Sequence, residues 1–112
     1  MNIVITGGSG FVGSYLCEKL INDGHEIIVI DNLLTGSTEN IKNLMVNENF
    51  SFVEHDVQDH IEIENKVDYV LHFASAASPK AYTEHPVNTL KAGSVGTINT
   101  LGLAKKHNAE YF

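Results

Sequence analysis

Short apolar runs recur along the chain at the length of β-strands. Runs rich in Val and Ile at Asn2–Thr6 and Glu26–Asp31, an alternating run at Phe50–Glu54 and an apolar run at Asp68–Phe73 predict four strands. Ala109–Phe112 predicts the beginning of a fifth strand. No internal repeat, linker or low-complexity tract interrupts this order, so one continuous unit is expected.

The stretches between these strands carry helical spacing. The first helix is predicted by apolar residues that recur every three to four positions, at Val12, Leu16, Leu20 and Ile21. A long helix is predicted from Pro86 to Lys105–Asn108 by a face made of Val87, Leu90, Val95, Ile98 and Leu101. A short helix is expected at Thr38–Met45, and Ala74–Pro79 is expected to be a loop.

Strands that alternate with helices predict βαβ units and a parallel sheet. Right-handed crossovers give the strand order 3-2-1-4, with the truncated fifth strand beyond the fourth. The expected fold class is therefore α/β, a Rossmann-type doubly wound parallel sheet that forms one domain over residues 1–112.

The charge and composition narrow the function classes. The formal net charge is −7 and all seven cationic side chains are lysines, so nucleic acid is not an expected partner and no guanidinium is present to hold a phosphate. The single cysteine, Cys17, excludes an intramolecular disulfide and a cysteine-based zinc site. No apolar run approaches the roughly 20 residues of a membrane span, and the first basic residue is Lys19, so a cytoplasmic protein is expected.

A glycine-rich turn joins the first strand to the first helix. Gly8, Gly10 and Gly13 fit G-x-G-x-x-G, and Gly7, Gly10 and Gly13 fit G-x-x-G-x-x-G. Glycine tolerates the tight turn, lets the backbone approach a pyrophosphate and lets the helix pack closely on the strand. The free N–H groups of the helix N-terminus then attract the anion. The turn predicts a dinucleotide site that needs no arginine.

An acidic residue stands where a dinucleotide site requires one. Asp31 ends the second strand, eighteen positions after Gly13, and its carboxylate can accept the ribose hydroxyls of an adenosine. It would repel the additional phosphate of NADP, and no lysine follows before Lys42, so NAD is the expected cofactor. A glycine turn that binds nothing and an S-adenosylmethionine site are the alternatives, whereas the absence of a Gly-Lys-Ser/Thr sequence excludes a P-loop.

Two histidine-containing segments suggest other chemistry. His55, Asp56, Asp59 and His60 could be metal ligands, but a polar strand exit explains them more simply and no metal is expected. His72, in a predicted buried strand, is expected to be a hydrogen-bonded core residue rather than a general base.

Several segments resemble one enzyme family. The string Thr6–Gly13 resembles the opening of the extended short-chain dehydrogenases/reductases of the NAD-dependent epimerase/dehydratase family. Asp31–Gly36, His55–Val57 and His72–Ser75 are similar to its ribose, adenine and strand-end segments. Within the family, Ala74–Tyr82 and the long helix are most similar to the UDP-glucuronate decarboxylases.

The resemblance implies roles for individual residues. Those expected to contact NAD are Gly7, Gly10, Phe11, Val12, Gly13, Asp31, Asn32, Thr35, Gly36, Asp56, Val57, Phe73, Ala74 and Ser75. Lys91 and Asn99 are expected to face the substrate. The chain departs from the family pattern at Gly93, Ala92 and Glu62, where Asn, Thr and Tyr are usual.

The resemblance also implies a reaction. Such enzymes oxidise a nucleotide-sugar, here a UDP-sugar, at its fourth carbon to a 4-keto intermediate; for a glucuronate the ketone allows loss of the carboxylate, and NADH then returns the hydride. Nucleotide-sugar 4-epimerases and 4,6-dehydratases share the first step and remain alternatives, as does a non-catalytic NAD-binding module. A homodimer is implied for the whole protein.

The family's catalytic Tyr-x-x-x-Lys pair is not expected among these residues. The only match, Tyr15 and Lys19, lies on the first helix, where it is expected to form a solvated face. The catalytic pair and the substrate domain are therefore expected beyond Phe112, and the chain is expected to be an incomplete, N-terminal part of an enzyme that does not turn over substrate alone.

Overall fold

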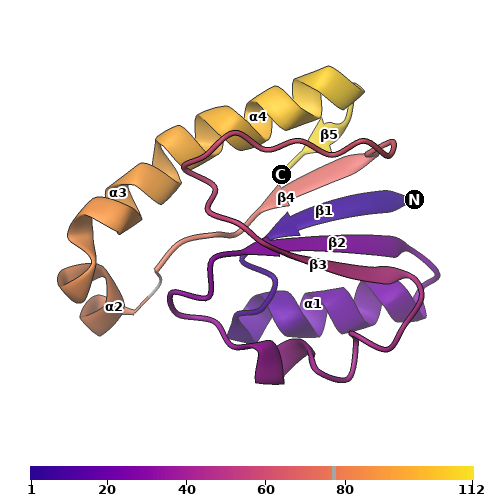
Figure 1. The fold of residues 1–112 in the computed structure, drawn as a ribbon, viewed down its shortest axis with the longest axis horizontal. Coiled ribbons are helices and arrows are strands. Elements are labelled where there is room, and N and C mark those ends of the chain that lie inside the picture. Colours follow the sequence, from indigo (N-terminus) through magenta and orange to yellow (C-terminus); the bar gives the residue numbers. More distant parts are fainter. Residues whose placement is uncertain (77) are drawn as a thin grey trace.

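The strands form one parallel sheet (Figure 1). A computed structural model describes residues 1–76 and 78–112. The sheet has the order β3-β2-β1-β4-β5, from β1 (Asn2–Thr6), β2 (Glu26–Asp31), β3 (Phe50–Glu54), β4 (Tyr69–His72) and β5 (Glu110–Tyr111). This confirms the predicted Rossmann-type sheet. Ala77, within the predicted loop Ala74–Pro79, lies outside the described residues.

Helices cover both faces of the sheet. They are α1 (Phe11–Asn22), the 3₁₀-helix η1 (Thr38–Ile41), α2 (Pro79–Glu84), α3 (Pro86–Gly93) and α4 (Val95–His107). Figure 1 shows α1 on one face and α4 on the other, with α3 extending α4 beyond the carboxyl ends of the strands.

The central strand is buried on both faces, as a doubly wound sheet requires. Ile3 and Ile5 of β1 pack with Cys17 of α1 on one face. On the other face, Val4 belongs to the cluster that contains Leu103 of α4. Two separate cores therefore hold the two helical layers to the sheet.

The connections diverge at the carboxyl end of β1. In the registers of β1 with its neighbours, Thr6 pairs with Ile30 of β2 on one side and with His72 of β4 on the other. In an open α/β sheet, the point where the strand order reverses leaves a crevice beyond the carboxyl ends of the strands. The glycine turn and the loop after β4 both start there.

One helix predicted from the sequence is wrong in length. The segment Thr38–Met45 forms only η1, capped by the Ser37 hydroxyl, which accepts a hydrogen bond from Glu39 N. The chain then continues as turns. Asparagine side chains favour such turns by bonding to the backbone, as Asn47 Oδ1 does with Asn49 N at 2.9 Å.

The long helix predicted from Pro86 is interrupted at Ser94. The Ser94 hydroxyl donates to Leu90 O and the Thr97 hydroxyl to Gly93 O, a pattern of side-chain bonding that bends helices. The structure also contains α2, which the sequence analysis assigned in part to a loop. Its signal is Ser78–Pro79, an N-cap that accepts from Ala81 N, followed by proline in the first turn.

The predicted apolar face of this helix lies in solvent. Of its members, Val87 is 59% exposed, Leu90 71% and Ile98 68%. The buried residues of α4 are instead Gly96, Thr100, Leu103 and Ala104. We call the exposed set Val87, Leu90, Val95, Ile98 and Leu101 the α3–α4 stripe.

Candidate functional site

A pocket of about 470 Å³ opens at the carboxyl ends of the central strands. All of the residues predicted to contact NAD line it: Gly7, Gly10, Phe11, Val12, Gly13, Asp31, Asn32, Thr35, Gly36, Asp56, Val57, Phe73, Ala74 and Ser75. Segments that are up to 68 residues apart in the sequence thus meet at one crevice. Contact of each residue with a cofactor remains a prediction.

The glycine turn has no room for side chains at two positions. Gly7 has φ +72°, and a Cβ there would lie 2.9 Å from Ala74 N. A Cβ at Gly13 would lie 2.5 Å from Gly7 O. The approach at Gly7 brings the glycine turn against the loop after β4, and the approach at Gly13 brings α1 against the glycine turn; both leave bare backbone on the pocket wall.

The N-terminus of α1 offers free donors to the pocket. Gly10 is the N-cap and supplies no side-chain cap, and no acidic residue lies in the first turn. Phe11, Val12 and Gly13 line the pocket, whereas the next N–H, that of Ser14, donates to Gly10 O at 3.0 Å. A 12-residue helix with open first-turn N–H groups favours an anion at this end.

Hydrogen bonds from the protein itself hold the Asp31 carboxylate in place. The residue as a whole is 8% exposed. One oxygen accepts from the backbone N–H of Ser9 at 3.1 Å and from the Ser9 hydroxyl, and the other accepts from Leu33 N at 2.8 Å. These donors satisfy the hydrogen-bonding capacity of a buried carboxylate, as buried polar groups require. Ser9 is a residue that sequence reasoning missed.

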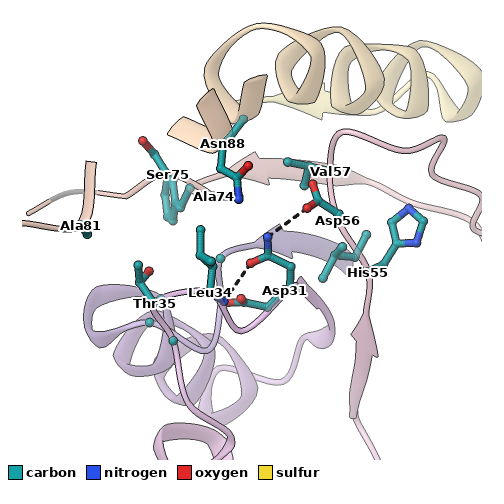
Figure 2. A pocket seen from close by; sticks show the side chains of 18 of the residues that line it. Asp31, Leu34, Thr35, His55, Asp56, Val57, Ala74, Ser75, Ala81 and Asn88 are labelled. Atoms are coloured by element: carbon teal, nitrogen blue, oxygen red, sulfur yellow. Dashed lines mark hydrogen bonds between the residues drawn. The ribbon is translucent and has the colours of Figure 1, made fainter. Parts of the chain in front are cut away.

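Asn32, which follows Asp31 in the sequence, is hydrogen-bonded to the loop after β3 (Figure 2). Asn32 Nδ2 donates to Asp56 Oδ2 at 3.1 Å, and Asn32 Oδ1 accepts from Leu34 N at 3.0 Å. The other oxygen of Asp56 accepts from Gln58 N at 2.9 Å. The two loops that flank the predicted adenosine position therefore form one connected wall.

His72 is hydrogen-bonded, as the sequence predicted, but it is half-buried at the end of β4 and belongs to neither core cluster. Its Nε2 lies 3.1 Å from the carbonyl oxygen of Ala92, which can only accept, so Nε2 carries the proton. Nδ1 then accepts from the Thr6 hydroxyl at 2.8 Å, and Thr6 Oγ1 accepts from Ala74 N at 3.1 Å. Burial lowers the pKa of His72, which favours this neutral form. The network fixes the loop after β4.

The residues predicted to face the substrate lie outside this pocket. Lys91 is exposed on α3. Asn99 of α4 donates its amide to Val57 O at 2.8 Å and to Asp59 O at 3.2 Å, which attaches the loop after β3 to the helix. Glu62 pairs with Lys106 and with His60.

The Tyr-x-x-x-Lys match is a feature of the α1 surface. Tyr15 is 65% exposed and meets Phe11 edge-on at a centroid distance of 5.4 Å. Lys19 forms an ion pair with Asp23 at 2.8 Å. Neither Tyr15 nor Lys19 lines the pocket.

Further lining residues were not predicted as site residues. They are Ile30, Leu34, His55, Gln58, Ser78, Ala81, Asn88 and Ala92. His55 belongs to the predicted adenine segment His55–Val57 and Gln58 follows it directly, so proximity in the sequence could have suggested both as lining residues. Asn88 and Ala92 come from α3, and only the packing of that helix over the crevice brings them to the pocket (Figure 2).

The described part of the chain holds neither a metal-binding cluster nor a membrane-spanning helix. There, no three His, Cys, Asp or Glu side chains come together as metal ligands. No helix within residues 1–76 and 78–112 is long and apolar enough to cross a bilayer.

The pocket's residues fit an NAD molecule. The bare glycine turn and the open helix end suit a pyrophosphate, and the buried carboxylate of Asp31 suits the hydroxyls of a ribose. Among the described residues, no lysine lines the pocket, so the additional phosphate of NADP would meet Asp31 without a compensating cation.

The chain is similar to other proteins along almost its whole length. UDP-glucuronic acid decarboxylase 1 of Danio rerio is 50% identical over 107 residues, which are 96% of this chain and 25% of that protein. UDP-glucose 4-epimerase of Thermotoga maritima, solved with UDP-glucose, has a TM-score of 0.82 at 34% identity and covers 97% of this chain and 35% of its own. The Thermus thermophilus UDP-glucose 4-epimerase complex with NAD has a TM-score of 0.76 at 30% identity, over 98% and 35% of the two chains.

The chain spans about a quarter of the length of the curated relatives it matches. The model of one family matches nearly all of it, from residue 3 to residue 112. Together with the parallel sheet, the glycine turn and the acidic end of β2, this match establishes that the chain belongs to the NAD dependent epimerase/dehydratase family.

Proposed function

We propose that this chain binds NAD in the pocket at the carboxyl ends of β1, β2 and β4. The observation that carries the proposal is the convergence of the glycine turn, the open N-terminus of α1 and the buried Asp31 on one crevice. The pyrophosphate lies against the first turn of α1 and the adenosine ribose against Asp31.

Asp31 gives the site its preference for NAD over NADP. Its carboxylate accepts ribose hydroxyls and repels a phosphate at the same place. Calorimetric titration of the chain should therefore give tighter binding of NAD than of NADP. Asp31→Ala should weaken NAD binding by roughly tenfold or more, since hydrogen bonds to a charged group contribute about 1.5–3 kcal/mol, and should narrow the gap between the two dinucleotides.

A matched control is Asp59→Ala, which removes an exposed carboxylate that does not line the pocket. It should leave both affinities unchanged. Equal affinities of the unmodified chain for NAD and NADP would refute the role given to Asp31.

For the whole protein we propose nucleotide-sugar modification, with UDP-glucuronate as substrate and decarboxylation as the outcome. Bound NAD would supply reversible hydride acceptance at the fourth carbon of the sugar, so that the sugar passes through a 4-keto intermediate. Within the present residues, the chain holds the cofactor, and the exposed Lys91 of α3 contacts the nucleotide-sugar, whereas the amide of Asn99 holds the loop after β3. The support is the 50% identity to a UDP-glucuronic acid decarboxylase.

Product analysis tests this part of the proposal. The whole protein, incubated with UDP-glucuronate, should release carbon dioxide and form UDP-xylose, detected by mass spectrometry. A C4 epimer or a dehydrated 4-keto-6-deoxy sugar from the corresponding substrates would instead assign it to the epimerases or dehydratases. The 112-residue chain alone should form none of these products, because its only Tyr-x-x-x-Lys lies outside the pocket.

We also propose that the whole protein is a homodimer that buries the α3–α4 stripe. Contiguous apolar side chains on one helical face, each about 40–70% exposed, are typical of an interface rather than of a solvated helix. The occupant is a second copy of the same face, as a two-fold symmetric contact requires.

A further inference from the structure

The Asn88 side chain of α3 lies in the wall of the pocket, and no side-chain hydrogen bond to it is found within residues 1–76 and 78–112. Asn88 is half-buried and lines the pocket, and Figure 2 shows it beside Val57 and Ala74, across the crevice from Asp31. None of the hydrogen bonds drawn among the lining residues in Figure 2 reaches it. With respect to the described residues, the donor and the acceptor of the Asn88 amide are therefore both available to a ligand.

Other asparagines near the site are committed to the protein itself. Asn32 bonds to Asp56 and to Leu34 N. Asn40 donates to Ser9 O at 2.9 Å, and Asn99 donates to two backbone carbonyls. Each of these amides connects two segments of the backbone or two loops by hydrogen bonds. In contrast, no hydrogen bond is drawn between the Asn88 amide and the other described residues that line the pocket.

The surroundings of Asn88 have the chemistry of a base-binding corner. Val57, Ala74 and Ala92 supply apolar surface around it. The polar groups at this corner are the Asp56 carboxylate, on the loop after β3, and the Asn88 amide, on α3. Apolar walls with polar groups at the edge suit a planar heterocycle whose rim carries donors and acceptors.

We propose that Asn88 recognises the adenine base of the dinucleotide, an inference that rests on the proposed NAD site. An asparagine amide matches adenine in particular: its oxygen accepts from the 6-amino group while its NH₂ donates to N7. In hypoxanthine the 6-amino group is replaced by a carbonyl, so the amide oxygen of Asn88 would face another acceptor. Asn88 thereby makes the pocket selective for the base as well as for the ribose.

The test compares NAD with nicotinamide hypoxanthine dinucleotide, in which the 6-amino group of the base is replaced by a carbonyl and N1 carries a hydrogen. Calorimetric titration of the unmodified chain should give a preference for NAD of roughly fivefold or more, the lower bound for a bidentate amide–adenine pair. Asn88→Ala and Asn88→Leu should each reduce that preference by roughly the same factor. Alanine and leucine are better helix formers than asparagine, so α3 should persist in both variants, which far-UV circular dichroism checks.

The matched control is Val87→Ala, one position away in α3 but 59% exposed and outside the pocket. It should leave both affinities and their ratio unchanged. If NAD binds the unmodified chain but the Asn88 variants keep the full preference, or weaken both dinucleotides equally, base recognition by Asn88 is overturned while the NAD site stands. If the unmodified chain binds neither dinucleotide, the proposed function fails and the inference with it.

Discussion

The pocket residues differ in how readily their roles could be predicted from the sequence. Gly13 and Asp31 were predictable because their roles depend on local geometry: a turn after one strand and the last residue of the next. Ser9 and Asn88 were not, because a hydroxyl that holds Asp31 and an amide on α3 acquire roles only when distant segments converge. Serine in a glycine turn and asparagine in a helix have no spacing signature.

The buried thiol of Cys17 gives a testable prediction about its reactivity. It is fully buried under Gly8 and Val29, and burial raises its pKa to about 12. At pH 8 roughly one thiol in ten thousand is then ionised, and the thiolate is the reactive form. A disulfide reagent such as DTNB should therefore react with the native chain far more slowly than with the chain in denaturant.

The urea-unfolded chain serves as the internal control, since it exposes the same thiol. Release of one equivalent of thionitrobenzoate from the native chain as fast as from the unfolded one would contradict the assigned burial of Cys17.

Among the elements, strands were easier to predict than helices. The bounds of β1, β2 and β3 agree with the predicted runs. The strands β1 and β2 are mostly buried and apolar along most of their length, whereas the edge strand β3 has an alternating pattern. The break at Ser94 and the short η1 depend on side chains that bond to nearby backbone, which apolar periodicity does not report. The apolar periodicity also predicted the wrong buried face for these helices. The α3–α4 stripe faces solvent, and the side of α4 that packs on the sheet carries mainly small residues.

Two glycines of α4 give opposite predictions. A Cβ at Gly102 would meet nothing within 4 Å, so Gly102→Ala should raise the free energy of unfolding by about 0.5–1 kcal/mol through helix propensity. A Cβ at Gly96 would lie 2.7 Å from Val57 Cγ2, so Gly96→Ala should overpack the helix–loop contact and lower that free energy by about 1–3 kcal/mol. Urea unfolding of both variants measures the difference.

Each variant is the control for the other, because both make the same change in the same helix. Stabilisation by both substitutions would mean that α4 does not rest on Val57 as closely as described.

At the scale of the whole molecule, the sheet order was predictable from the chirality of crossovers and is confirmed. The surfaces were less predictable, because exposure depends on which side of a helix meets the sheet. Asn99, expected from the resemblance to face substrate, is engaged in holding the loop after β3 to α4.

The proposed dimer gives a prediction at this scale. Ile98→Glu places a charge in the centre of the α3–α4 stripe, where it would be desolvated between two copies. The whole protein should therefore shift from dimer to monomer, as measured by sedimentation velocity. Val46→Glu, at a residue 89% exposed in the turns after η1, is the control and should remain dimeric. A dimer that persists with Glu at position 98 would exclude the stripe as the interface.

The central place of β1 also sets an order of events during synthesis. Its pairing with β2 joins residues 24 apart in the sequence, as in Asn2 with Glu26, whereas its pairing with β4 joins residues 66 apart, as in Ile3 with Tyr69. Because a chain emerges from its N-terminus and longer loops close at a greater entropic cost, we expect β1, β2 and β3 to associate before β4 is available. During that interval one edge of the central strand β1 is unpaired, so this edge is the place where the nascent chain is most exposed to wrong pairing.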